Sequence, residues 1–233
     1  MTREVGPLLA SGRDGDIFEY GPGLVLRRTR DGRSLENEAR VMSFAAECGY
    51  PVPAVEDVLA DGTEIVMERI DGPMMMDVMV KQPWTMARSA SMLADLHDSL
   101  HEILAPGWLT QLPDGGDRFV HLDLHPMNVM LSARGPVVID WTNASRGEAL
   151  TDTSLTYVLL TCPQIPAPRV VRALAQPARA FLARMFARRY RGPAFNAHLV
   201  VAAEMKALDR NMLPTEVAAC QRLAIRARRK SAG

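Results

Sequence analysis

The segment His121-Leu122-Asp123-Leu124-His125-Pro126-Met127-Asn128 is followed after nine residues by Val138-Ile139-Asp140-Trp141, and these two stretches carry the chemistry of the chain. Three polar side chains stand out in them: Asp123, Asn128 and Asp140. Carboxylate and amide oxygens suit Mg²⁺, and phosphoryl transfer requires a carboxylate beside the hydroxyl that accepts the phosphoryl group. A loop entering a strand can direct Asp123 to a substrate and Asn128 to a metal. The pattern predicts all three as catalytic residues, with Asn128 and Asp140 as metal ligands.

Two other interpretations of this segment stay open. The two aspartates and the asparagine could serve only as turn and capping residues. Alternatively, His121, Asp123 and His125 alternate as H-x-D-x-H, which on a strand would present three zinc ligands on one face. Pro126 favours a loop over a strand, and no glutamate base or further histidine lies nearby. A metal-dependent hydrolase is therefore kept as the last alternative.

Upstream of this segment, the sequence predicts a small sheet with one helix. Tyr20-Gly21-Pro22-Gly23 separates two short strand patterns, and Asp61-Gly62 separates two more. Apolar residues at helical spacing follow Ser34, a good N-cap, and Gly49 ends that pattern. The predicted elements are strands over 16–19, 24–28, 55–60 and 64–68 and a helix over 35–48.

The rest of the chain is predicted to be mainly helical. Asp71-Gly72-Pro73 is the best candidate for a linker, and an amphipathic pattern over 84–104 predicts a long helix. Short apolar runs at 129–131 and 137–139 predict a hairpin. Beyond residue 152 only helical patterns follow, with breaks near 163–168, 192–193 and 214.

Together these features resemble the aminoglycoside phosphotransferase and choline kinase-like family, a branch of the protein-kinase-like fold. The catalytic loop of the family resembles residues 121–128, and its metal motif resembles residues 139–141. The fold class that follows is α+β with two lobes. The N-lobe, residues 1–70, would hold a small antiparallel sheet with one helix, and the larger C-lobe, residues 71–233, would be mainly helical.

The resemblance extends to the parts of the N-lobe that bind a nucleotide. A glycine-containing loop precedes the first hairpin, a strand of that hairpin carries a cation, the helix offers a glutamate to it, and the second hairpin leads to the interlobe hinge. The nucleotide-binding residues implied at these places are Gly12, Gly15, Val25, Arg27, Glu38 and Glu68.

The function implied by the resemblance is an ATP- and Mg²⁺-dependent phosphotransferase that moves the γ-phosphoryl group to a hydroxyl of a small molecule. Asp123 would be the catalytic base or would orient the acceptor. His121 and His125 would shape the loop, and Asp152 would have a structural role at the start of a helix. A nucleotide-binding protein of the same fold without kinase activity is the alternative.

Position 27 is where the chain departs from the family pattern, which has a lysine there. This chain has no lysine before Lys81. Strand alternation places Val25 and Arg27 on one face and Arg28 on the other. Arginine stays charged and binds phosphate oxygens bidentately, although its planar fork is wider than an ammonium group. We expect Val25 to face the base and Arg27 to reach the phosphates, with Glu38 as partner unless that glutamate lies on an exposed face.

The formal net charge of zero combines two opposite blocks. Residues 1–152 carry a net charge of −11, whereas residues 153–233 carry 14 basic and three acidic residues, a net charge of +11. A polycationic acceptor requires an acidic groove, so a neutral or anionic hydroxylated metabolite fits better than an aminoglycoside. Acidic residues of the earlier loops keep an aminoglycoside open as an alternative acceptor. Arginines at helical spacing in the tail are expected to form solvated faces. These are Arg184, Arg188, Arg191, Arg222, Arg226 and Arg229.

Composition also bounds the compartment and the partners. Three widely separated cysteines, the lack of an apolar leader and the lack of a membrane-length apolar run predict a cytoplasmic protein without a membrane partner. The zero net charge and the absence of a recognised binding module argue against nucleic acid as a partner. Because the helical tail is short, a homodimer in which a second chain completes the acceptor site is left open.

Overall fold

The computed structural model describes residues 4–12, 15–163 and 169–231. The chain divides into two compact units, one of residues 1–75 and 127–142 and the other of residues 76–126 and 143–233. The sequence placed a single boundary after residue 70, whereas the first unit also includes the later segment 127–142. An antiparallel sheet in the first unit and a set of helices in the second confirm the predicted α+β class.

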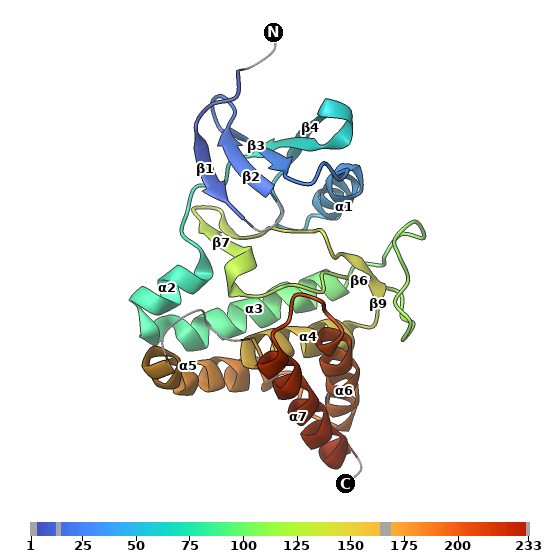
Figure 1. Ribbon diagram of the computed structural model, residues 1–233. Helices are drawn as coiled ribbons and strands as arrows, with labels where there is room; N and C mark the ends of the chain where they lie inside the picture. The colour runs from blue at the N-terminus through green and yellow to red at the C-terminus, as the bar shows by residue number, and fades with distance from the viewer. Residues whose placement is uncertain (1–3, 13–14, 164–168, 232–233) are drawn as a thin grey trace. The chain divides into compact units, whose positions relative to one another are not determined.

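The first unit is built on a five-stranded antiparallel sheet in the order β1-β2-β3-β5-β4 (Figure 1). The central strand carries Leu26, which is fully buried. The four predicted strands are confirmed. The edge strand β1 has no sequence signal because all four of its side chains are exposed, so no buried face imposes an alternating pattern. The strands of this unit are β1 (Leu8–Ser11), β2 (Gly15–Glu19), β3 (Leu24–Thr29), β4 (Val55–Leu59), β5 (Glu64–Glu68), β7 (Val129–Ser132) and β8 (Gly135–Val138).

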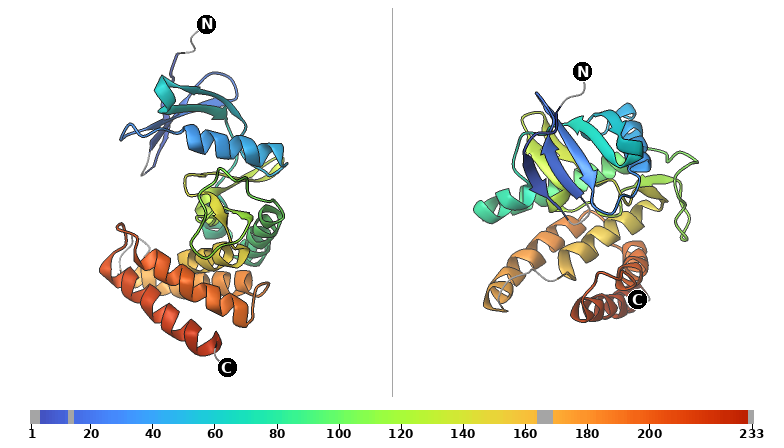
Figure 2. Two further views of the ribbon diagram at one scale, coloured as in Figure 1. Left: turned by 90° about the vertical axis from the view of Figure 1, so that its right-hand side faces the viewer. Right: turned by 45° about the horizontal axis from the view of Figure 1, so that its top comes forward.

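The helix α1 (Glu36–Glu47) runs along the sheet beside β4 (Figure 2). Its apolar side is held by a buried cluster of Leu35, Ala39 and Ile65. Ser34 Oγ accepts a hydrogen bond from the Glu36 N–H at 3.2 Å, although the N-cap position of the helix falls on Leu35 and not on the predicted Ser34. A short 3-10 turn, Ala60–Gly62, joins β4 to β5. The helix predicted over 35–48 is confirmed to within one residue at each end.

The hairpin of β7 and β8 belongs to the first unit because backbone hydrogen bonds tie it to earlier segments. The Val138 N–H donates to the Pro51 carbonyl at 2.8 Å, and the Leu131 N–H donates to the Pro73 carbonyl at 2.9 Å. Its strands pair antiparallel, as predicted, and Gly135 takes a positive φ of 111° in the turn. The far ends of this hairpin carry two of the predicted site residues.

The second unit surrounds α4, in which eight of 13 residues are buried and the other five are partly buried. Helices α5 and α6 pack against α4, and α7 packs against α6 (Figure 1). Proline begins α6 and α7, where a missing N–H costs least, so two predicted helix breaks are confirmed. The third predicted break includes residues 164–168, which lie outside the described residues. The elements are α2 (Met75–Lys81), α3 (Met86–His101), β6 (Arg118–Val120), β9 (Ser145–Gly147), α4 (Ala149–Thr161), α5 (Arg169–Ala187), α6 (Pro193–Ala207) and α7 (Pro214–Ser231), with 3-10 turns at Pro83–Thr85 and Pro126–Asn128.

The core of the second unit joins these helices through small and aromatic side chains. Phe195 and Leu199 of α6 pack with Val158 of α4 and with Cys220 of α7. Leu122, next to the predicted catalytic residue, is partly buried against the same cluster. None of the helices in the described parts of the chain is both long and apolar enough to cross a membrane.

We expect Gly15→Ala to lower the free energy of unfolding by about 1–3 kcal/mol, the usual cost of overpacking. A Cβ on Gly15 would overlap the carbonyl oxygen of Arg28 on the paired strand. Gly12→Ala is the matched control, because a Cβ there would meet the Gly15 carbonyl only at an ordinary 3.6 Å. Urea denaturation measures both, and equal midpoints for the two variants would contradict this account.

Candidate active site

The open end of the β7–β8 hairpin brings Asn128 and Asp140 close in the first unit. The strands pair Val129 with Val138, and the Ile139 N–H donates to the Asn128 carbonyl at 3.0 Å. The Asn128 side chain is buried, whereas the Asp140 side chain is 37% exposed. Asp140 also adopts a positive φ of 64°, a conformation that costs a non-glycine residue energy and is found most often at functional sites. Carboxylate and amide oxygens thus lie at one end of one hairpin.

Arg27 and Glu38 form an ion pair between β3 and α1. The guanidinium is 11% exposed and the carboxylate 4%, so water screens the pair only weakly. Burial raises the pKa of Glu38 and the attraction of Arg27 partly offsets this, while Asp140 raises it further. The pairing of these two residues expected from the sequence is therefore present, and the burial of Glu38 excludes the exposed location that the sequence had left open.

Thr142 connects this ion pair to Asp140. Its hydroxyl lies 3.0 Å from Glu38 Oε2 and 3.1 Å from Asp140 Oδ1, and Arg27 Nη2 lies 3.5 Å from the same hydroxyl. The remaining contact closes the ring, because Arg27 Nη2 lies 4.0 Å from Asp140 Oδ1. A fixed cation therefore stands beside a carboxylate that the sequence predicted as a metal ligand. Thr142 itself has no sequence signal, since its role depends on residues more than 100 positions away.

The other predicted nucleotide-binding residues lie on the same sheet. Val25 is buried on the central strand. Gly12 donates its N–H to the Gly15 carbonyl at 2.9 Å, and the two residues between them lie outside the described part of the chain. The Glu68 carboxylate is engaged within the unit, accepting from Arg134 at 2.7 Å and from the Ala54 N–H at 3.2 Å. Any contact of Glu68 with a nucleotide would therefore compete with an existing ion pair.

The predicted catalytic loop of the second unit contains Asp123, whose side chain is 24% exposed. The Asp123 N–H donates to Nδ1 of the fully buried His121 at 3.2 Å, and His125 Nε2 lies 3.7 Å from Asp123 Oδ1. His121 therefore supports the backbone of the loop. Within the described residues, the two histidines and Asp123 do not form a cluster of metal-ligand size, and the zinc arrangement considered above has no support in the geometry.

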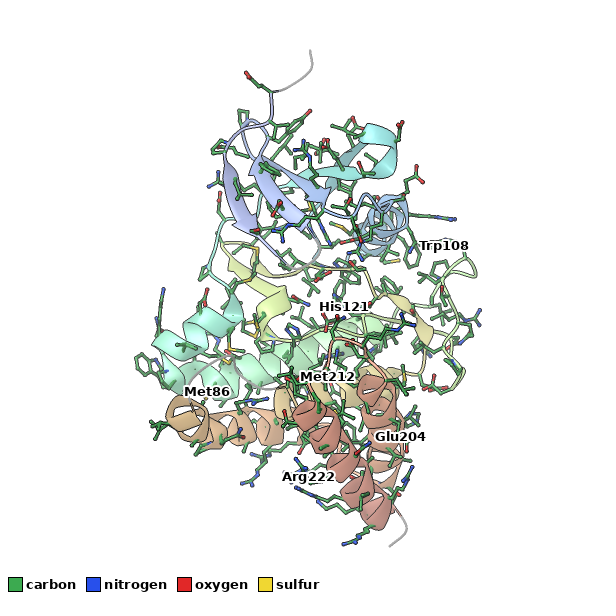
Figure 3. The ribbon with its side chains drawn as sticks, viewed as in Figure 1. Met86, Trp108, His121, Glu204, Met212 and Arg222 are labelled. Atoms are coloured by element: carbon green, nitrogen blue, oxygen red, sulfur yellow. The ribbon has the colours of Figure 1, made fainter. Side chains whose placement is uncertain are left out.

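Asp152, at the start of α4, binds the backbone of this loop, including that of His121, which Figure 3 labels. Its Oδ1 accepts from the Leu122 N–H at 2.8 Å, and its Oδ2 accepts from the His121 N–H at 3.2 Å. Leu122 has a positive φ of 64°, which an aliphatic side chain rarely tolerates. The fully buried carboxylate thus fixes a strained peptide immediately before Asp123.

Two histidines of α3 complete the surroundings of Asp152, and the sequence did not single out either of them. His101 Nε2 lies 2.9 Å from Asp152 Oδ2, and His97 Nδ1 lies 3.4 Å from the same oxygen. Burial raises the pKa of Asp152, but the attraction of His97 and a hydrogen bond with His101 outweigh it and hold that pKa well below its usual range. Burial lowers the pKa of His97. The i, i+4 spacing was the available signal for a shared partner.

These three side chains are also the one group in the described residues whose ligand atoms are close enough to hold a metal, all lying within 4.8 Å of one another. Both oxygens of Asp152 already accept backbone N–H groups. His97 Nε2 is bonded to Thr156 Oγ1 at 2.9 Å, and Thr156 donates to the Leu124 carbonyl at 2.7 Å. The geometry therefore favours a hydrogen-bonded support for the loop.

Comparisons with known proteins give one family and one fold. A model of the phosphotransferase enzyme family matches residues 81–198, slightly more than half of the chain. No curated protein matches the chain in sequence. A ternary complex of a thermostable mutant of aminoglycoside phosphotransferase APH(4)-Ia with ADP and hygromycin B has a TM-score of 0.69 at 17% identity, covering 98% of this chain and 95% of that chain.

Two further solved structures are similar. ADP-bound aminoglycoside phosphotransferase APH(2'')-Ib has a TM-score of 0.62 at 16% identity over 96% of this chain and 92% of that chain. A choline/ethanolamine kinase family protein from Mesorhizobium loti has a TM-score of 0.54 at 17% identity, over 98% and 89% of the two chains. At these identities the likeness concerns the fold, and it confirms the predicted protein-kinase-like architecture.

We expect the free energy of unfolding to fall as the pH drops from 7 to 5, with His97 as one cause. Because the pKa of His97 is lowered in the folded state, the unfolded chain binds a proton first below its ordinary value of about 6.5, and stability is lost at up to about 1.4 kcal/mol per pH unit. Chemical denaturation at several pH values measures the slope. His97→Gln should reduce it. Identical slopes in His97→Gln and the wild type would refute this assignment.

Proposed function

The chain belongs to the phosphotransferase enzyme family, and we propose that it transfers the γ-phosphoryl group of ATP to a hydroxyl group of a small molecule. One observation carries the proposal. A buried ion pair fixes the guanidinium of Arg27 4.0 Å from the carboxylate of Asp140, at the hairpin end where Asn128 also lies. A cation beside hard oxygen ligands is the combination that a metal-bound polyphosphate requires.

Asn128 and Asp140 would hold Mg²⁺ in this proposal. Their oxygens fit a hard cation. Among the described residues, Thr142 bonds to one carboxylate oxygen of Asp140 and leaves the other available to a ligand. When bound, Mg²⁺ neutralises the charge of the phosphates. Thr142 orients the Asp140 carboxylate, and the positive φ of Asp140 is one that the surrounding contacts maintain.

Arg27 would bind phosphate oxygens in place of the lysine that the family pattern has. Glu38 and Thr142 fix the guanidinium, so little side-chain entropy is lost when a nucleotide binds. Glu38 accepts from one nitrogen of the Arg27 guanidinium, and N–H groups of the guanidinium that remain can donate to phosphate oxygens. Val25 would lie against the base, and the backbone of the loop that contains Gly12 and Gly15 would approach the phosphates.

Asp123 would orient the acceptor hydroxyl and take its proton as the oxygen attacks phosphorus. The hydrogen bonds of the loop fix the position of Asp123. His121 accepts the N–H of Asp123, and Asp152 accepts the N–H groups of the two residues before it. Such preorganisation matters because a displacement of about 1 Å can cost about 100-fold in rate. We propose a neutral or anionic hydroxylated acceptor, because the helical tail carries few acidic residues.

Replacing Asp123 by asparagine should lower kcat by about 100- to 10,000-fold, the usual contribution of a positioned general base, with little change in the KM for ATP. The measurement is ATP-dependent phosphorylation of a panel of alcohols, sugars and antibiotics, followed by mass spectrometry of the products. Wild-type turnover retained in Asp123→Asn would reject its role. Tight ATP binding without transfer to any member of a broad panel would favour the alternative, a nucleotide-binding protein without kinase activity.

Arg27→Gln should raise the KM for ATP by about 10- to 100-fold, which corresponds to one charge-assisted hydrogen bond. Arg28→Gln is a matched control on the next residue, because Arg28 is 43% exposed and pairs with Glu64 instead. Since Arg27→Gln leaves Glu38 buried without its partner, the double variant Arg27→Gln/Glu38→Gln separates lost folding from lost binding. Equal KM values for the Arg27 and Arg28 variants would contradict the assignment.

A further inference from the structure

A cavity of about 600 Å³ lies among α4, α5, α6 and α7, wholly within the second unit. This volume is in the range of about 300–1,000 Å³ that small-molecule sites occupy. Its walls include buried apolar side chains, among them Phe195, Leu199 and Ala227. Tyr157, Thr161 and Asn196 add polar groups to the lining. The cavity therefore has the size and composition of a ligand site.

Four cations line this cavity from two sides. Arg184 and Arg191 come from α5 and the turn after it, and Arg226 and Lys230 come from one face of α7. Among the described residues, no aspartate or glutamate belongs to the lining, and none of the four cations forms an ion pair. Unpaired cations that converge on a concave site create a positive potential that favours anions.

The few acids of the helical tail are engaged elsewhere and do not neutralise this cavity. Glu204, labelled on α6 in Figure 3, pairs with Arg228, and Asp209 pairs with Lys206 at 2.7 Å. Glu216 accepts a backbone N–H at the start of α7 at 2.8 Å. These are the three acidic residues between positions 153 and 233. The acids of this region therefore leave the four cations of the cavity unneutralised.

The cavity and the catalytic loop lie on different faces of α4. At 100° per residue, Tyr157 and Thr161 lie about 140° and 180° around the helix from Asp152. Asp152 binds the loop, whereas Tyr157 and Thr161 line the cavity. The cationic site is therefore separate from the proposed place of phosphoryl transfer, and the basic tail does not have to belong to the acceptor site.

We propose that this cavity is a second binding site, for a small molecule that carries at least two phosphate groups. Arginine presents a planar fork that matches phosphate oxygens, and cations supplied by two separate segments favour a ligand with charge at more than one point. The apolar walls would accept the rest of such a molecule. This site does not depend on the proposed kinase activity.

The probe is inorganic pyrophosphate, titrated calorimetrically into the full-length protein with EDTA present. We expect binding that is tighter than that of orthophosphate and that weakens with added salt. The double variant Arg184→Gln/Arg226→Gln should weaken it by about 10- to 100-fold. Arg188→Gln/Arg229→Gln is the matched control: it removes the same charge from the same region, but neither residue lines the cavity.

Two further variants keep the result interpretable. Ala180→Trp fills the cavity without changing charge at an exposed position, and it should also weaken binding. Arg27→Gln should leave pyrophosphate affinity unchanged, which separates this site from the proposed nucleotide site. Circular dichroism confirms folding of each variant. No binding by the wild type, equal losses in both double variants, or loss in Arg27→Gln would overturn the proposal.

Discussion

The buried carboxylate of Asp152 is the constraint on which the catalytic loop depends. A charge with no exposure to water is stable only when several donors surround it. Two backbone N–H groups donate to it and His101 Nε2 lies at hydrogen-bond distance, and the two N–H groups belong to the two residues that precede Asp123. The same hydrogen bonds stabilise the charge of Asp152 and hold Leu122 at its positive φ. This is why α4 is buried yet carries polar residues.

The first unit uses a similar arrangement at Asp140. The backbone of Asp140 also has a positive φ. A buried acid, Glu38, is connected to Asp140 through the hydroxyl of Thr142, which contacts both carboxylates. The difference is the partner of the buried acid: two histidines in one unit and Arg27 in the other. An arginine stays charged at every physiological pH, so the cation beside Asp140 is permanent, whereas burial lowers the pKa of His97 beside Asp152.

The sequence predicted those features that local pattern determines. The strands on both sides of Gly21 and Gly23, the helix after Ser34 and the hairpin ending at Asp140 each have their own periodicity or turn signal. It could not predict β1, whose side chains are all exposed, or β6 and β9, which have three residues each. In the site, alternation along β3 was enough to place Arg27. Thr142, His97 and His101 contact residues that are distant in the sequence, and no local pattern reports such contacts.

The opposite charges of the two parts of the chain acquire a structural meaning from the ion pairs. In the helical tail the few acids bind cations or backbone away from the cavity, so the net charge of +11 does not spread evenly. The arginines at helical spacing were predicted to form solvated faces, and all six are exposed. Arg188 and Arg229 lie outside the cavity lining, whereas Arg184, Arg191 and Arg226 also belong to its rim. Helical spacing alone cannot separate these two groups, because both repeat at three or four residues. The distinction arises only when α5 and α7 pack with their charged sides toward a common space.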